Sequence, residues 1–179
     1  MVIGNQEWMA ENLRTTRNNS GQYVDYYSSA MGSDEAYGLH YNWYTANDEI
    51  CPEGWHLPSD QEFQELELYL GMDPSELNAT GSRHSGSVGG KMKEIGNEHW
   101  ESPNHGATNE SEFTALPAGY VQWQTGNSHY NEGQHAYYWT SSSHDGTRAW
   151  ARDLYSSHAG VDRPNYDKNY SYSIRCVRD

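Results

Sequence analysis

Residues 41–71, YNWYTANDEICPEGWHLPSDQEFQELELYLG, contain the clearest helix signal in the chain. Ser59 follows a proline and stands at the N-cap position, and Glu62 comes three residues later, which is the spacing of a capping box. Gly71 is a typical residue at which a helix ends. Between them, apolar residues recur at intervals of three and four on one helical face, at Phe63, Leu66 and Leu70. The stretch therefore predicts an amphipathic helix of about three turns with one buried stripe.

The composition is poor in aliphatic side chains and rich in aromatic ones. The 179 residues include only 9 Leu, 4 Ile, 6 Val and 2 Phe, and with a net charge of −14 that content is typical of disordered chains. However, the chain also has 15 Tyr and 7 Trp, whose rings can bury as much surface as the missing aliphatic residues. We therefore expect a single folded domain, residues 1–179, with an aromatic core, long irregular loops and many hydrogen bonds from side chains to the backbone.

Charge and hydrophobicity argue against two classes of partner. Phosphate contacts need clustered basic residues, whereas the 11 Lys and Arg of this chain are scattered, so we expect no nucleic-acid binding. No segment approaches the roughly 20 apolar residues of a membrane span, so we expect no membrane insertion. The first residues, MVI, resemble the start of a trimmed domain, and a localisation signal is expected upstream if the chain is the C-terminal part of a longer protein.

The two cysteines, Cys51 and Cys176, lie 125 positions apart, and neither belongs to a CxxC pair. Two interpretations remain open at this point: two buried free thiols, or a disulfide that joins the entry of the main helix to the C-terminal strand. We favour the disulfide. Closing so long a loop is worth about 4–5 kcal/mol in the loop-entropy model, and the bond would indicate an oxidising compartment or a virion or cell surface.

The rest of the chain predicts helices first and strands later. We expect a short helix at residues 42–46, a second short helix after Asp73, irregular structure at 78–90, and another helical turn at 91–95. Strands are expected at 113–116, at 136–142 and 147–154 around a His-Asp-Gly turn, and at 172–177. Residues 15–38 are expected to form a loop held by tyrosines. Because an antiparallel sheet dominates the second half, the predicted class is α+β.

Several motifs, in order, resemble one known family. They are IGNQEWMAENLR at 3–14, YNWYTA at 41–46, CPEGWHLPSDQEF at 51–63, FTALPAGY at 113–120, YYWTSS at 137–142, AWARDL at 149–154 and SIRCVRD at 173–179. Together they resemble the Fibrobacter succinogenes major paralogous domain family over nearly the whole chain. GWHLPSDQEF also resembles the helix entry of formylglycine-generating-enzyme-like domains. Both groups are related to the C-type lectin-like fold, so the resemblance implies that fold: two helices, a mainly antiparallel sheet, long irregular loops, adjacent termini and a Cys51–Cys176 disulfide.

The resemblance also suggests a function. Some lectin-like domains of this kind are the variable proteins of diversity-generating retroelements, in which a rigid fold displays a diversified C-terminal patch on a phage or cell surface. Adenine-directed mutagenesis there yields mainly Asn, Asp, His, Tyr, Ser and Gly. Residues 120–170 are rich in these types and resemble an antibody paratope, although any hydrophilic sheet with long loops has a similar composition.

On this hypothesis some side chains bind the target and others support the fold. The residues expected to point outward and bind a target are Trp123, His129, Tyr130, Tyr137, Ser143, His144, Arg148, Asp153, Tyr155, His158, Asp162, Tyr166, Asp167 and Asn169. The residues expected to belong to the scaffold are Trp139, Trp150, Leu154, Ile174, Arg175 and Cys176. The expected partner is a protein or glycan on another cell or virion surface.

Other chemistry finds little support in the sequence. The chain has no HExxH or HxH pair and no EF-hand loop, so we expect no metal site and no cofactor. The sugar-binding motifs of C-type lectins are missing, and Ser102-Pro103-Asn104 only partly resembles one, so calcium-dependent carbohydrate binding remains an alternative function. A second alternative is that the domain is a structural module of a surface protein. No GxSxG, GxxxxGK[ST] or GxGxxG motif is present, and we expect no catalytic residues and no enzyme activity.

Overall fold

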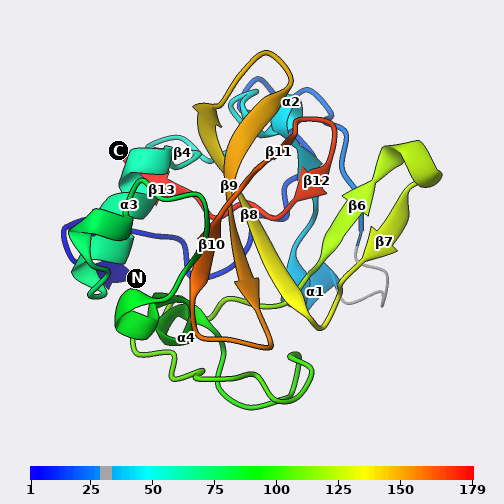
Figure 1. Ribbon diagram of the computed structural model, residues 1–179. Coiled ribbons are helices and arrows are strands. Elements are labelled where there is room, and N and C mark those ends of the chain that lie inside the picture. Colours follow the sequence, from blue (N-terminus) through cyan, green and yellow to red (C-terminus); the bar gives the residue numbers. More distant parts are fainter. Residues whose placement is uncertain (29–33) are drawn as a thin grey trace.

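The computed structural model describes residues 1–28 and 34–179; the rest of the expected tyrosine-held loop, residues 29–33, lies outside the described residues (Figure 1). The strands are β1 (Val2–Ile3), β2 (Gln6–Glu7), β3 (Tyr41–Asn42), β4 (Trp55–His56), β5 (Gly81–Arg83), β6 (Tyr120–Gln122), β7 (Ser128–Tyr130), β8 (His135–Ser143), β9 (Arg148–Tyr155), β10 (Val161–Arg163), β11 (Asn165–Asp167), β12 (Ser171–Tyr172) and β13 (Val177–Arg178). The helices are α1 (Asp34–Tyr37), α2 (Trp43–Ala46), α3 (Asp60–Tyr69) and α4 (Val88–Met92), with 3-10 turns η1 (Pro74–Glu76), η2 (Ser85–Ser87) and η3 (Trp123–Thr125).

The long hairpin of β8 and β9 forms the centre of the larger sheet. β9 pairs antiparallel with β8 on one edge, and on its other edge with β10 near its end and with β11 near its start. β5 extends this sheet beyond β10. A second antiparallel sheet has the order β3–β12–β6–β7, and the α+β class is therefore confirmed.

The main helix, α3, has the predicted boundaries. The Ser59 side chain accepts a hydrogen bond from the Glu62 amide, while the Glu62 carboxylate accepts one from the Ser59 amide at 2.7 Å. Phe63 and Leu66 are completely buried and Leu70 nearly so, which confirms the apolar stripe. α3 lies against one face of the central sheet (Figure 1), because this stripe packs into a core with Trp8, Phe113, Tyr138, Leu154 and Val161.

A second core lies on the other face of β8 and β9. It contains Trp139 and Ala151 from the central sheet, Tyr172 and Ile174 from the C-terminal segment, and Tyr41 from β3. As expected of an aromatic core, ring polar atoms bond to the backbone: the Trp139 indole donates to the Tyr41 carbonyl at 3.1 Å, and the Tyr41 hydroxyl donates to the Thr15 carbonyl at 2.8 Å. The central sheet is therefore covered on both faces, but the second core covers only part of its face.

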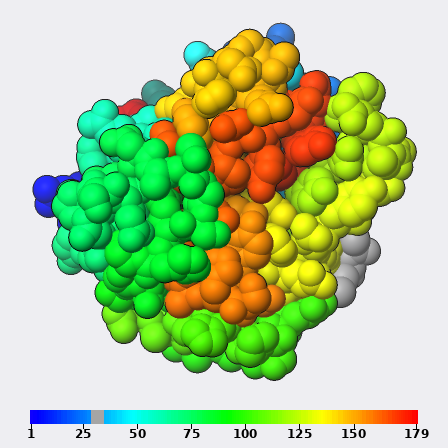
Figure 2. All heavy atoms as spheres, in the orientation of Figure 1, coloured from blue at the N-terminus to red at the C-terminus, as the bar shows by residue number. Residues whose placement is uncertain are grey.

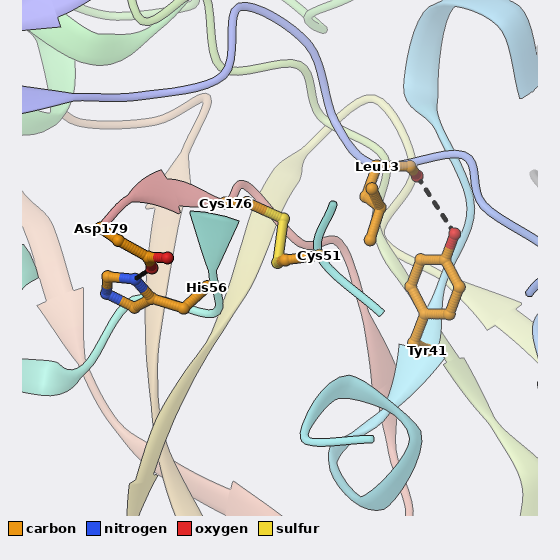
Figure 3. Close-up of a disulfide and its surroundings, with 6 residues drawn as sticks. All are labelled: Leu13, Tyr41, Cys51, His56, Cys176 and Asp179. Carbon is orange, nitrogen blue, oxygen red and sulfur yellow. Dashed lines mark hydrogen bonds and ion pairs between the residues drawn. A yellow bond between two sulfur atoms is a disulfide. The ribbon is translucent and has the colours of Figure 1, made fainter. Parts of the chain in front are cut away.

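The predicted disulfide is present. Cys51 and Cys176 are bonded, with their Cα atoms 6.0 Å apart, and Figure 3 shows the bond between the segment that leads to β4 and the C-terminal segment. Beside it the His56 imidazole lies between two carboxylates. Nδ1 contacts Asp179 at 2.7 Å (Figure 3), and Nε2 contacts Glu62 at 2.7 Å. The C-terminus is thus tied both covalently and electrostatically to the start of α3.

Four expectations about secondary structure were wrong in detail. Residues 78–90 are not irregular, because β5, η2 and the start of α4 lie there, and the helical turn expected at 91–95 begins at Val88 instead. Residues 113–116 form no regular strand, since Thr114 has φ of 50° and only Ala115 makes a bridge. The last expected strand is divided into β12 and β13, with residues 171–177 all buried. In the described part of the chain, the helices are too short and too polar to cross a bilayer.

Candidate functional site

On the same face of the central sheet as the second core, and continuous with it, lies a polar and aromatic group. In β8 and β9 residues alternate between faces, and the register places His135 opposite Tyr155 and Tyr137 opposite Asp153. On the next strand, Asp162 pairs with Asp153. We call this group the Asp153 cluster; its members are His135, Tyr137, Asp153, Tyr155, His158, Asp162 and Tyr166. Its strands, coloured from yellow to red-orange, share one face of the molecule in Figure 2.

Asp153 lies at the centre of the cluster and has no exposed surface. His135 Nδ1 is 3.1 Å from one of its oxygens, and the Tyr166 hydroxyl donates to the other at 3.4 Å. Burial raises the pKa of the Asp153 carboxyl to about 6, although the hydrogen bond from His135 opposes the rise. The site therefore holds a carboxylate whose charge is poorly solvated and changes just below neutral pH.

Asp162 is the second buried carboxylate of the cluster. Its side chain is 8% exposed, and Ser82 Oγ on β5 donates to Oδ2 at 2.9 Å. Within residues 1–28 and 34–179, no donor reaches Oδ1. A buried carboxylate oxygen without a hydrogen bond is unusual, because it loses its hydration without compensation.

Rings form the walls around the two carboxylates. The Tyr155 ring lies 4.2 Å from the His135 ring and stacks on the His158 ring at 4.5 Å. Tyr137 stacks between His135 and Tyr172, with centroids 5.3 and 5.0 Å apart. Burial, followed by the charge of Asp153, raises the pKa of the Tyr155 and Tyr137 hydroxyls, which therefore stay protonated.

A buried lysine fixes the turn that carries Tyr155 and His158. Lys93 Nζ donates to the Tyr155 carbonyl at 2.8 Å, the His105 carbonyl at 3.0 Å and the His158 carbonyl at 3.1 Å. Burial lowers the pKa of Lys93 to about 8. Three backbone acceptors on one ammonium hold the turn after β9 in place.

Eleven of the fourteen residues expected to be displayed have exposed or partly exposed side chains. They fall into three groups. The β6–β7 hairpin carries Trp123, His129 and Tyr130. The β8–β9 turn and the neighbouring β11 segment carry Ser143, His144, Arg148, Asp167 and Asn169, and the Asp153 cluster contains Tyr155, His158 and Tyr166. Trp123 is 49% exposed. These three groups lie on separate parts of the fold, because the β6–β7 hairpin and the β8–β9 turn extend in different directions from the central sheet (Figure 1).

The expectation that Tyr137, Asp153 and Asp162 point outward was wrong, because their side chains are 4%, 0% and 8% exposed. Tyr137 is covered on both ring faces, and the two carboxylates lie below the rings of the cluster. The scaffold residues behave as expected: Trp139, Leu154, Ile174, Arg175 and Cys176 are buried. Trp150 is partly exposed and lies between the Arg163 guanidinium, 3.7 Å from its ring centroid, and the His144 ring.

Sequence reasoning missed two members of this site. His135 was not among the residues expected to be displayed, yet its two-residue spacing from Tyr137 on β8 could have placed it on the same face. Ser82 has no such signal, because β5 lies in a segment that was expected to be irregular, and its partner Asp162 is 80 residues away.

One further group of described residues could offer ligand atoms to a metal ion: Glu94, Glu98 and His99. His99 Nδ1 already contacts both Glu94 carboxylate oxygens, at 2.8 and 3.0 Å, so two of the three groups are bonded to each other. Asn104, from the segment that partly resembles a lectin motif, is buried, and its amide donates to the Glu94 and Gly96 carbonyls. That side chain holds the adjacent loop and does not face solvent.

The comparisons with known proteins give a family. The model of the Fibrobacter succinogenes major domain matches residues 1–178. No curated protein and no solved structure matches the chain.

Proposed function

Because the chain belongs to the Fibrobacter succinogenes major domain family, which confirms the family resemblance, we propose that it is a non-enzymatic binding module, the variable protein of a diversity-generating retroelement. Its C-terminal third presents a diversified surface to a macromolecular target, a protein or glycan on another cell or virion. The observation that carries this proposal is the Asp153 cluster, in which partly exposed Tyr and His rings stand on rigid strands. Stiff aromatic rings beside small polar groups are the usual components of a paratope.

The division of residue types along the strands supports this function. The partly exposed positions of the cluster are His135, Tyr155, His158 and Tyr166, all of them types that adenine-directed mutagenesis yields. The neighbouring buried positions, Arg152 and Leu154, are not of those types and face the α3 side. A diversification mechanism that changed only the first set would leave the scaffold intact.

A C-type lectin-like fold is part of the proposal. Two features support it. The N-terminal and C-terminal segments are adjacent, since Trp8 makes an antiparallel bridge to Val177 and the Arg178 guanidinium contacts the Glu7 carboxylate at 2.8 Å. The disulfide joins the segment before the main helix to the last strand.

The same disulfide supports a location outside the reducing cytosol, and we propose that the domain acts at a cell or virion surface or in the extracellular space. Asn104 does not support the calcium-dependent lectin alternative, because its side-chain amide donates hydrogen bonds to backbone carbonyls inside the protein. Binding therefore needs no metal in this proposal.

The test uses a target selected by a binding screen and three variants. Replacing Tyr155, His158 and Tyr166 together by alanine should abolish binding while the domain stays folded. Because these rings are partly buried, the variant should melt below the wild type, unlike variants of fully exposed residues. Trp139→Ala should unfold the domain, since truncating a fully buried aromatic residue costs about 3–5 kcal/mol and its indole also bonds to the Tyr41 carbonyl.

The matched control for lost stability is Leu70→Ala. Leu70 is 8% exposed and lies on α3, on the opposite face of the central sheet, and its truncation costs about 2–5 kcal/mol. Measured well below its melting temperature, this variant should bind the target as the wild type does. A folded triple variant that retains full affinity would remove the proposed surface. In the genome, a near-copy of the 3′ coding region that differs only at adenines, beside a reverse transcriptase gene, tests the retroelement assignment.

A further inference from the structure

The turn between β9 and β10, residues 156–160, packs against α4 through its backbone. The Gly90 amide in α4 donates to the Ala159 carbonyl at 2.9 Å. Gly89 approaches so closely that a Cβ there would lie 1.9 Å from the Gly160 carbonyl oxygen, which only glycine permits. The backbone of this turn is therefore fixed by close contacts, and the side chains that it carries are the part that can move.

The His158 side chain is bonded to its own turn. Its Nδ1 accepts a hydrogen bond from the Gly160 amide at 3.1 Å, so Nδ1 carries no proton in this arrangement. The neutral ring then carries its proton on Nε2, and a further proton can go only to Nδ1. Protonation there would set two N–H groups against each other and break the bond to Gly160.

The His158 ring lies between two other rings. It stacks on the Tyr155 ring at 4.5 Å, and the His84 ring makes a T-shaped contact with it at 5.1 Å. His84 also lies against the turn, since a Cβ on Gly160 would be 2.7 Å from its Nδ1. His84 is exposed and His158 is partly exposed, so protons from the solvent reach both imidazoles. Two imidazolium rings at this distance would repel each other.

The surroundings of His158 favour its neutral form. Burial is the largest effect and lowers the pKa of the His158 ring. The charge of Asp162 on β10 opposes this effect. Charges on His84, on Lys93 at the end of α4 and on His135 in β8 add to it. Lys93 is anchored there, because its ammonium donates to the His158 carbonyl at 3.1 Å. The ring is therefore neutral at neutral pH and gains its charge in mild acid.

From this geometry we propose that His158 is a pH-sensitive switch in the binding surface. At neutral pH the uncharged ring is bonded to the Gly160 amide and stacked on Tyr155. In mild acid the protonated ring leaves both contacts and turns to solvent, so the surface loses one aromatic wall beside Tyr155 and gains a cation. A target held at neutral pH is then released. The movement of the ring rests on contacts within this chain, whereas the release of a target also rests on the proposed binding function.

The first experiment follows the NMR signals of the isotope-labelled domain between about pH 8 and about pH 5. The His158 ring should titrate below the usual histidine value of about 6.5. The Gly160 amide proton should move upfield with the same midpoint, because it loses its hydrogen bond, and the Tyr155 ring signals should shift with it. The amide of Ala151, in the centre of the sheet, should not move. A Gly160 amide signal that stays constant through the titration of His158 would overturn the inference.

His158→Asn distinguishes the switch from a purely structural side chain. The Asn oxygen also accepts from the amide two residues later, as in an Asx-turn, but the side chain does not titrate. In this variant the Gly160 amide signal should stay in place down to about pH 5. The control is His105→Asn, an exposed histidine beside the same turn, which should leave the wild-type transition unchanged. If the Gly160 amide of His158→Asn still moves with the wild-type midpoint, another group drives the change and the inference fails.

The second experiment measures binding of the screened target to the wild type and to His84→Asn. Affinity for the wild type should fall at least about tenfold between about pH 7.5 and about pH 5, with the midpoint of the His158 titration. His84→Asn removes a neighbouring positive charge and should move both midpoints to higher pH. Equal affinity at the two pH values, while the His158 ring titrates, would refute the release. If the target survives the triple alanine variant of Tyr155, His158 and Tyr166, the proposed function itself fails, whether or not the ring moves.

Discussion

Replacing Glu67 by glutamine should destabilise the domain strongly, because it removes one of only two anions from a buried ionic network. Glu67 has no exposed surface. Its carboxylate contacts Arg83 Nη2 at 2.6 Å and Arg152 Nε at 2.5 Å. Arg152 and Arg163 also contact Asp60, so three guanidinium groups share two carboxylates. The substitution would leave three buried cations with one anion.

The expected loss follows from the cost of an uncompensated buried charge. Breaking a buried ion pair by removing one partner typically costs about 3–5 kcal/mol. For a chain of this length, 1 kcal/mol lowers the melting temperature by about 2–4 °C, so Glu67→Gln should melt about 6–20 °C below the wild type. The loss should hardly change with salt, because water and ions do not reach the network.

The assay is thermal unfolding followed by circular dichroism, at low and at high salt. The control is Glu65→Gln on the same helix, where the side chain is exposed and the expected change is below about 0.5 kcal/mol. Replacing Glu67, Arg83 and Arg152 together by apolar residues of similar volume should recover most of the loss. If Glu67→Gln melts within a degree or two of the wild type, or if high salt removes the difference, the network does not carry the stability assigned to it.

Two further predictions concern the C-terminus. Burial lowers the pKa of His56, but the carboxylates of Asp179 and Glu62 outweigh burial, and the net pKa in the folded protein is raised. The stability due to this contact is therefore fully present below about pH 6.5 and is lost as the pH rises through the pKa of His56 in the folded protein. His56→Gln should therefore flatten the dependence of the melting temperature on pH around neutrality, and an unchanged profile would refute the assignment. Native protein treated with an alkylating agent without reductant should keep its intact mass, and reduction of Cys51–Cys176 should cost about 5 kcal/mol by loop entropy; two alkylated thiols in unreduced protein would contradict the bond.

Local sequence was enough to predict the main helix and the central hairpin, because both depend on neighbouring residues. The capping box needs only Ser59 and Glu62, and the β8–β9 turn needs only a short polar segment between two strand-like runs. The disulfide was favoured over two free thiols from the two cysteines alone, and the family resemblance implied the same pair. By contrast, β5 could not be predicted, since its strand conformation depends on pairing with β10 about 80 residues later.

The site was predicted only in part for the same reason. Tyr155, His158 and Tyr166 were correctly expected to be accessible, but the burial of Asp153 and Asp162 was not expected, because acidic residues are usually exposed. What hides Asp153 is a contact with His135 from the other strand and with Tyr166 from a third. Neither contact is visible in the local pattern of β9.

The order of residues in β9 and β10 couples the scaffold to the site. In each strand an arginine and an aspartate lie side by side in the sequence: Arg152 with Asp153, and Asp162 with Arg163. The antiparallel register that pairs the two aspartates on one face therefore directs both arginines toward Asp60 and α3 on the other. A shift of one residue would put the guanidinium groups on the face with the partly exposed rings and the carboxylates in the helix interface, which neither face could tolerate. The ionic network that stabilises α3 against the sheet thus also fixes where Asp153 and Asp162 stand, so substitutions at the partly exposed rings should leave the two carboxylates in place.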